Sequence, residues 1–114
     1  MKYPITPVPK PRMTQRDKWK VRPCVARYRA FKDEVKLRRV KVNEYGDSVI
    51  FLMPMPKSWS KKKKEEMDGT PHQQKPDWDN LGKALSDAVY DDDSKIWNIT
   101  ISKMWAYEGA IEIL

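Results

Sequence analysis

Apolar residues recur at helical spacing in two parts of the chain, and each recurrence predicts a main helix with one buried face. The first helix is expected from about Pro23 to Arg39. Its apolar stripe, spaced four, three and four residues apart, is Cys24, Tyr28, Phe31 and Val35. The second helix is expected from about Asp79 to Tyr90, on the stripe Leu81, Ala84, Leu85, Ala88 and Val89.

Other apolar segments have the length and pattern of strands. Residues 48–55 form a mostly apolar run, which predicts a central strand. Residues 96–107 alternate loosely between apolar and polar side chains, which also favours a strand. The pair Glu108-Gly109 then turns the chain into a last strand at 110–114.

The remaining segments are shorter or irregular. The proline-rich start around Ile5 and Val8 predicts an irregular edge strand, followed by a basic loop at 16–22. A short helix is expected at 61–67, with its N-terminus capped by Ser58 or Ser60. Strands and helices in this order predict one small α+β (mixed α/β) domain over residues 1–114, with a mixed sheet.

Composition supports a folded chain and narrows its surroundings. The 114 residues suffice for one modest core, and five tryptophans, five tyrosines and six methionines argue against disorder. The single cysteine, Cys24, excludes an intramolecular disulfide. No apolar run approaches the roughly 18 residues that span a bilayer, so we expect a cytoplasmic protein that does not insert in a membrane.

Charge divides the chain into two halves. Residues 1–64 hold 19 lysines and arginines against 5 acidic residues, a formal charge of +14, whereas residues 65–114 hold 4 against 11, a charge of −7. The basic half is typical of a surface that neutralises nucleic-acid phosphates, although a solvated basic face without a partner is the alternative. The candidate DNA-binding residues are Lys10, Arg12, Arg16, Lys18, Lys61, Lys63, Lys64 and Lys75.

The acidic half concentrates its carboxylates in one short segment. Apart from Asp87, five aspartates lie within 17 residues: Asp77, Asp79, Asp91, Asp92 and Asp93. Ionised carboxylates held close together repel one another, so a fold that gathers them usually supplies a cation between them. All the offered ligands are hard oxygen atoms, which favours Mg²⁺, with Mn²⁺ as a possible substitute.

The spacing of the aspartates limits how they can share an ion. Residues two apart on a helix point roughly 200° away from each other, whereas on an extended chain they point the same way. Asp77 is therefore expected on the extended segment before the helix, with Asp79 near the N-cap. Asp93 would approach from the segment leading into the next strand. If the backbone there is extended, Asp92 would face the opposite way, as a supporting or alternative ligand.

Lys83 follows Asp79 by one helical turn and stands beside the proposed metal site. It could form an ion pair with Asp79 or with Asp87, or it could neutralise charge on a scissile phosphate, and the residues alone leave both roles open. Asp87 is interpreted as a surface charge. His72, the single histidine, is interpreted as an ordinary polar residue in a mobile-looking loop at 69–74.

These motifs resemble a known family. The segment KPDWDNLGKALSDAV, followed by DDSKI, is similar to the signature of the RusA-type Holliday junction resolvases, which are found mainly in bacteria and their phages. Upstream, TPVPKPRMTQRDKW and MPMPKSWSKKKKEEM resemble the phage-type members. The resemblance implies a homodimeric mixed α/β nuclease that uses Mg²⁺ to nick opposing strands of four-way DNA junctions.

The resemblance also implies roles for individual residues. The family's metal-binding aspartates fall on Asp77, Asp79, Asp92 and Asp93, and its catalytic or phosphate-contacting lysine falls on Lys83. The chain departs from the family's pattern because only Tyr90 and Asp91 separate the helix from the aspartate pair, and because Lys95 replaces a usual glutamine. The shorter spacing leaves open which two of Asp91, Asp92 and Asp93 occupy the family's positions.

We therefore expect metal-assisted phosphodiester hydrolysis, with catalytic roles for Asp77, Asp79, Asp93 and Lys83 and without a small-molecule cofactor. The alternatives are a non-catalytic nucleic-acid-binding protein and a nuclease of broader branched-DNA or flap preference. Paired cuts require two sites, so a homodimer is expected. Its interface could use strand residues such as Ile99, Ile101 or Trp105.

Overall fold

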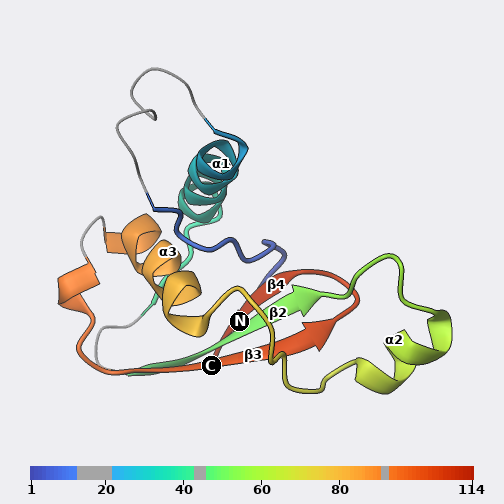
Figure 1. Ribbon diagram of the computed structural model, residues 1–114. Helices are drawn as coiled ribbons and strands as arrows, with labels where there is room; N and C mark the ends of the chain where they lie inside the picture. Colours follow the sequence, from blue (N-terminus) through green and yellow to red (C-terminus); the bar gives the residue numbers. More distant parts are fainter. Residues whose placement is uncertain (13–21, 43–45, 91–92) are drawn as a thin grey trace.

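The computed structural model describes residues 1–12, 22–42, 46–90 and 93–114, and it shows an α+β fold as predicted (Figure 1). In these ranges the helices are α1 (Pro23–Leu37), α2 (Lys61–Met67) and α3 (Trp78–Tyr90), together with the 3-10 turn η2 (Asp93–Lys95). The strands are β1 (Lys2–Tyr3), β2 (Asp47–Pro54), β3 (Ile99–Ala106) and β4 (Ala110–Ile113). In these ranges no helix is long and apolar enough to cross a membrane.

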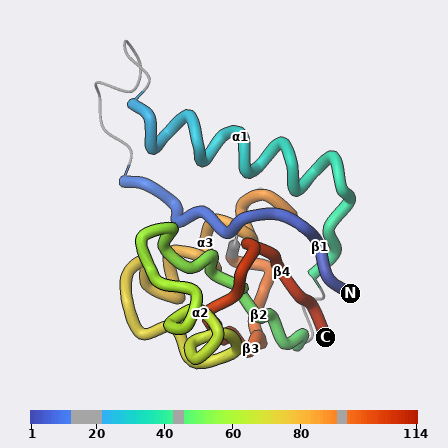
Figure 2. Tube along the Cα trace, turned by 90° about the vertical axis from the view of Figure 1, so that its right-hand side faces the viewer, coloured from blue at the N-terminus to red at the C-terminus, as the bar shows by residue number. Residues whose placement is uncertain are grey.

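The four strands form one mixed sheet in the order β1-β4-β2-β3. The expectation of a central strand at 48–55 is confirmed, because β2 pairs in parallel with β3 and antiparallel with β4. The amino terminus supplies an edge strand, as predicted, but the strand is only β1, paired with β4. Ile113 donates its N–H to the carbonyl of Met1, so the two termini lie side by side (Figure 2).

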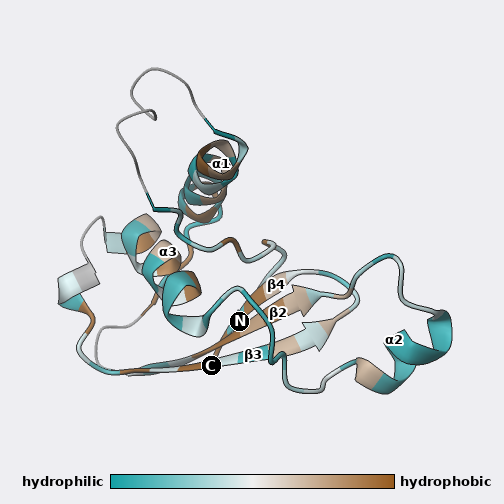
Figure 3. Cartoon of the chain, viewed as in Figure 1, coloured by the Kyte–Doolittle hydropathy of each residue, from teal (hydrophilic) through white to brown (hydrophobic). Residues whose placement is uncertain are grey.

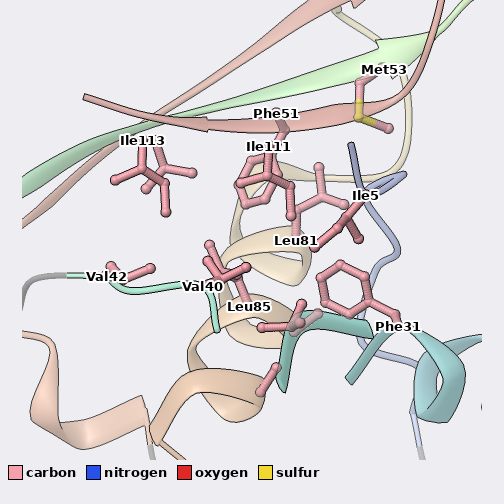
Figure 4. Close-up of a cluster of buried hydrophobic side chains, with 14 of the residues drawn as sticks. Ile5, Phe31, Val40, Val42, Phe51, Met53, Leu81, Leu85, Ile111 and Ile113 are labelled. Atoms are coloured by element: carbon pink, nitrogen blue, oxygen red, sulfur yellow. The ribbon is translucent and has the colours of Figure 1, made fainter. Parts of the chain in front are cut away.

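Helix α3 lies over one face of the sheet, and α1 packs against α3 farther from the strands (Figures 1 and 2). The core between them contains the fully buried side chains Phe51, Leu81, Leu85 and Ile111 (Figure 4). The stripe predicted on α1 is wrong at one position, since Cys24 is half-buried and Val25 is fully buried in its place. The buried face of α1 therefore starts one residue later than the spacing predicted.

Helix α2 lies apart from α1 and α3 and is polar except at its last residue, Met67 (Figure 3). It begins as predicted at Lys61, because the Ser60 side chain accepts a hydrogen bond from the N–H of Lys63 at 3.2 Å. Gly69 follows the helix with a positive φ of 77°, a backbone conformation that glycine adopts without steric cost. The chain then turns back toward β3.

The loop after α2 is not mobile-looking as expected, because it runs along β3. Gly69 donates its N–H to the Trp105 carbonyl, and His72 donates its N–H to the Lys103 carbonyl, both at 2.9 Å. The His72 ring is buried and lies 4.2 Å from the Trp105 ring, centroid to centroid. These contacts carry the chain along the sheet to the start of α3.

Candidate active site

Asp77 and Asp79 lie at the start of α3. Asp77 precedes the helix and its carbonyl accepts the N–H of Leu81 at 3.3 Å, which places Asp77 at the N-cap. The predicted location of Asp77 before the helix is confirmed, and Asp79 is near the N-cap as expected, as the second helical residue. The helix starts earlier than predicted because its first turn includes Trp78, an exposed residue outside the apolar stripe. Asp77 is exposed and Asp79 is half-exposed.

Lys103 of β3 holds the segment that leads to these aspartates. Its ammonium donates hydrogen bonds to the carbonyls of Gln74 and Pro76, both at 2.7 Å. Sequence reasoning missed this residue, although a signal was present. Lys103 occupies the phase of β3 that otherwise carries Ile99, Ile101 and Trp105, and a lysine on an apolar face of a strand needs a polar partner.

Lys83 pairs with Asp79 rather than with Asp87. Its Nζ lies 3.9 Å from Asp79 Oδ2, and about half of each side chain is exposed to solvent. An exposed pair of this kind contributes only a few tenths of a kcal/mol, or about 0.3–0.5 kcal/mol for residues four apart on a helix. Solvent access and weak pairing leave the Lys83 ammonium available to a phosphate.

A hollow of about 290 Å³ lies beside this pair, between one face of α3 and the start of β3. Its α3 side includes Asp79, Gly82 and Lys83, and its other side is formed by Ile96, Ile99 and Ile101. A Cβ atom at Gly82 would lie 2.8 Å from Ile101 Cδ1, so glycine permits this close approach. Ile96 is only three residues after Asp93, so the chain leaving the acidic segment passes Asp79 and Lys83.

The remaining aspartates of the predicted cluster are described only in part. Asp91 and Asp92 lie outside the described residues, and so does the side chain of Asp93, whose backbone begins η2. Asp93 opens a 3-10 turn, so an extended backbone, the condition for Asp92 and Asp93 to face opposite ways, is not met at Asp93. The alternation of an extended chain therefore does not determine which way Asp93 faces. Within the described part of the chain, no three histidine, cysteine or acidic side chains gather at one point.

The two described carboxylates nevertheless fit a magnesium site. Asp77 and Asp79 both offer hard oxygen atoms and are accessible to solvent. Mg²⁺ is commonly bound through one or two carboxylates together with waters and substrate phosphates. The positive end of a helix would not favour a metal ion, but two carboxylates there outweigh the partial charge of about +0.5. The donor set is therefore compatible with this ion.

A second, basic cavity of about 510 Å³ lies next to Lys83. Its lining residues are Lys10, Pro11, Arg12, Asn80 and Lys83. The predicted DNA-binding residues Lys10 and Arg12 are thus brought to the start of α3, where the Lys10 N–H donates to the Asn80 carbonyl at 3.1 Å. Sequence reasoning gave Asn80 no role, although this residue lies in the signature segment KPDWDNLGKALSDAV.

Asp87 is not the surface charge that we expected. Its side chain is only 14% exposed, and its Oδ2 lies 2.5 Å from Lys10 Nζ. The same oxygen accepts a hydrogen bond from the Tyr28 hydroxyl at 2.9 Å. Burial, together with the hydrogen bond and charge of Asp87, raises the pKa of Tyr28, so its hydroxyl remains a donor.

The other predicted DNA-binding residues lie elsewhere. Lys61, Lys63 and Lys64 lie on α2, away from α3 (Figure 1), and Lys75 is exposed before the start of α3. The Nζ of Lys63 lies 4.3 Å from the centre of the Trp59 ring, a cation–π contact. Arg16 and Lys18 lie outside the described residues. The structure therefore brings together only part of the predicted DNA surface.

Comparison with known proteins agrees with the resemblance noted in the sequence. A family model described as Endodeoxyribonuclease RusA matches residues 4–114. The comparisons with curated proteins and with solved structures give no match. Because the family match extends over nearly the whole chain, this protein belongs to the RusA family of endodeoxyribonucleases, which act on Holliday junction DNA.

Proposed function

We propose that this protein is a Mg²⁺-dependent endonuclease that resolves four-way DNA junctions by paired nicks on opposing strands. Membership of the RusA family supports cleavage of junction DNA. The observation that carries the proposal is the location of Asp77 and Asp79 at the start of α3, beside Lys83 and the basic cavity. Carboxylates for a metal and cations for DNA thus meet at one end of one helix.

Asp77, Asp79 and Asp93 are the proposed metal ligands, with Asp92 as a further candidate. Mg²⁺, or Mn²⁺ in its place, would supply the activated water and the positive charge that phosphodiester hydrolysis requires. The chain's own part is to hold the carboxylates in place. The bonds from Lys103 to the carbonyls of Gln74 and Pro76 fix the backbone directly before Asp77.

Lys83 is proposed to contact the scissile phosphate. Charge builds on the phosphate oxygens as the bond to the leaving oxygen breaks, and a nearby ammonium stabilises that charge. The 3.9 Å separation from Asp79 is long for a salt bridge, so a phosphate oxygen could compete for the Lys83 ammonium.

A homodimer is the proposed assembly, because each chain carries a single aspartate segment and paired cuts require two. Trp105 cannot serve the interface as we expected, since it is 4% exposed and packs between Trp59 and His72. Ile99 and Ile101 remain partly exposed candidates. Sedimentation at micromolar concentration should give a mass near twice 13.5 kDa, whereas a monomer that still makes paired cuts would contradict the dimer.

Selectivity for the junction provides the test of the proposed activity. A synthetic four-way junction, a 5′-flap and a linear duplex of matched sequence are incubated with the protein, in Mg²⁺ and in EDTA. We expect cleavage of the junction in Mg²⁺ alone and little cleavage of the duplex. Equal cleavage of the flap would indicate a broader branched-DNA nuclease. Tight binding without cleavage in either Mg²⁺ or Mn²⁺ would indicate a non-catalytic DNA-binding protein.

A further inference from the structure

The basic segment Lys10–Arg12 is fixed to both of the main helices. Lys10 donates its backbone N–H to the Asn80 carbonyl of α3 at 3.1 Å. Arg22, at the start of α1, donates from its guanidinium to the Arg12 carbonyl at 2.7 Å. The segment therefore connects the start of α1 to α3, and it forms one wall of the basic cavity described above.

The Lys10 side chain is fixed as well as its backbone. Its ammonium lies 2.5 Å from Asp87 Oδ2, and the same oxygen accepts the hydroxyl of Tyr28 from α1. Asp87 is mostly buried, whereas 38% of the Lys10 side chain is exposed. The Asp87 carboxylate, which is held by the buried Tyr28 hydroxyl, thus fixes the Lys10 ammonium while part of the lysine remains exposed to solvent.

The lining of the cavity is suited to an anion. Lys10, Arg12 and Lys83 are cationic, and Asn80 adds an amide to the polar groups of the wall. Lys83 also lines the hollow that contains Asp79, so the two cavities share one residue. An anion bound in the basic cavity would therefore lie next to the proposed site of cleavage.

We propose that this cavity binds a backbone phosphate of the DNA, adjacent to the phosphate that is cut, and that Asp87 and Tyr28 are positioning residues for Lys10. This inference rests on the proposed function for the identity of the anion. A phosphodiester carries one negative charge and oxygen acceptors for several donors, which matches lysine, arginine and amide groups converging from two elements.

The inference predicts a result opposite in sign to that of simple electrostatics. Removing a carboxylate from a DNA-binding surface normally strengthens DNA binding, because one repulsive charge is removed. If Asp87 acts by positioning Lys10, Asp87→Asn should instead weaken binding, although it makes the protein more positive. Tyr28→Phe, which removes only the hydroxyl, should weaken binding in the same direction and to a smaller extent.

The test measures binding of a fluorescently labelled four-way junction in EDTA, so that cleavage plays no part. For Asp87→Asn we expect affinity to fall roughly three- to tenfold. The slope of log K against log salt should fall by up to about one unit, as expected when one phosphate is no longer neutralised. Asp33→Asn is the matched control, because it removes an exposed carboxylate from α1; its affinity should stay equal to or slightly above that of the wild type.

A double-mutant cycle separates positioning from a general loss of structure. If Asp87 acts through Lys10, the double variant Lys10→Met, Asp87→Asn should bind no more weakly than Lys10→Met alone. Lys10→Arg should retain most of the affinity. Thermal unfolding of each variant shows whether the fold is kept. If Asp87→Asn fails to fold, the junction affinity of Tyr28→Phe, which keeps the aromatic ring in place, still tests the positioning of Lys10.

Several outcomes would overturn the inference and leave the proposed function intact. One is tighter junction binding by Asp87→Asn with normal cleavage, and another is an additive double-mutant cycle. A third is that Asp87→Asn weakens binding of inorganic phosphate, at matched ionic strength, without changing junction binding, which would assign the cavity to a free anion. Failure of the wild type to cut any junction would remove the proposed function, while the binding comparison could still be read.

Discussion

Two groups of lysines, one at α3 and one on α2, have different surroundings in the structure. Lys83 lies on α3 and Lys10 packs against it, and each has an acidic partner on this helix. Lys61, Lys63 and Lys64 lie on α2, whose residues are all exposed or half-exposed. The comparison shows that positive charge alone does not define a site. A site also requires contacts that hold the charged side chain beside a reactive group.

The largest expected effect is at the α3 end of this comparison. Asp77→Asn and Asp79→Asn each remove a proposed metal ligand and keep every cation of the basic cavity, so both variants should bind junction DNA at least as tightly as the wild type and fail to cut it. Asp93→Asn is expected to behave in the same way. Gel-shift and cleavage assays on the same preparations check this. Near-normal cleavage by one of the variants would exclude that aspartate from the site.

Lys83 should show the next largest effect, and Lys63 is its matched control on α2. Lys83→Met should lower the cleavage rate of bound junction by about 10²- to 10³-fold, because charge on the phosphate is no longer neutralised. Lys63→Met should leave this rate unchanged, since the Lys63 ammonium lies over the Trp59 ring. Single-turnover kinetics at saturating protein measure both. Equal rate losses in the two variants would remove the distinction between the two groups.

The α2 lysines should affect binding rather than chemistry. Replacing Lys61, Lys63 and Lys64 with alanine should weaken junction binding and lower the slope of log K against log salt by up to about one unit for each phosphate that is no longer neutralised. Cleavage of fully bound junction should stay the same. An unchanged salt slope would show that α2 is simply solvated and makes no contact with DNA.

The smallest effect is expected in the loop that connects the two regions. Burial, and next the Lys103 ammonium, lower the pKa of His72 below its usual 6.5, so the folded state binds this proton less readily than the unfolded state. The free energy of unfolding should therefore decrease as the pH falls below about 6.5. His72→Gln should flatten this dependence between about pH 7 and pH 5. Urea unfolding at each pH measures it, and since His72 is the single histidine, an unchanged profile would contradict its titration.

The helices and the central strand could be predicted because their patterns are local. The periodicity of apolar residues predicts the ends of α1 and α3 to within two residues, and the serine before four lysines predicts the start of α2. The start of β3 was placed three residues too early, since η2 and the residues after it interrupt the alternation. Val25 is buried where Cys24 was expected because of the way α1 is rotated against α3. The spacing of residues within one helix does not specify this rotation.

The chemical groups of the site could be predicted from the sequence, whereas the contacts that position them could not. The spacing of Asp77, Asp79 and Lys83 could be read from the sequence, and the structure places these three residues together. The contact between Tyr28 and Asp87 joins residues 59 positions apart, so it exists only in the folded chain. Lys103 gave a weak signal as a lysine in an apolar phase. The sequence could not show that it supports the backbone before Asp77.

The measurement that tests the central claim most directly is strand-resolved cleavage of a four-way junction. Each of the four strands is labelled in turn, and the products are separated under denaturing conditions after incubation with Mg²⁺. We predict nicks at symmetric positions in one pair of opposing strands, and loss of all nicks in EDTA and in Asp79→Asn. A junction that stays bound and uncut in Mg²⁺ and in Mn²⁺, or one that Asp79→Asn cuts at the wild-type rate, would contradict it.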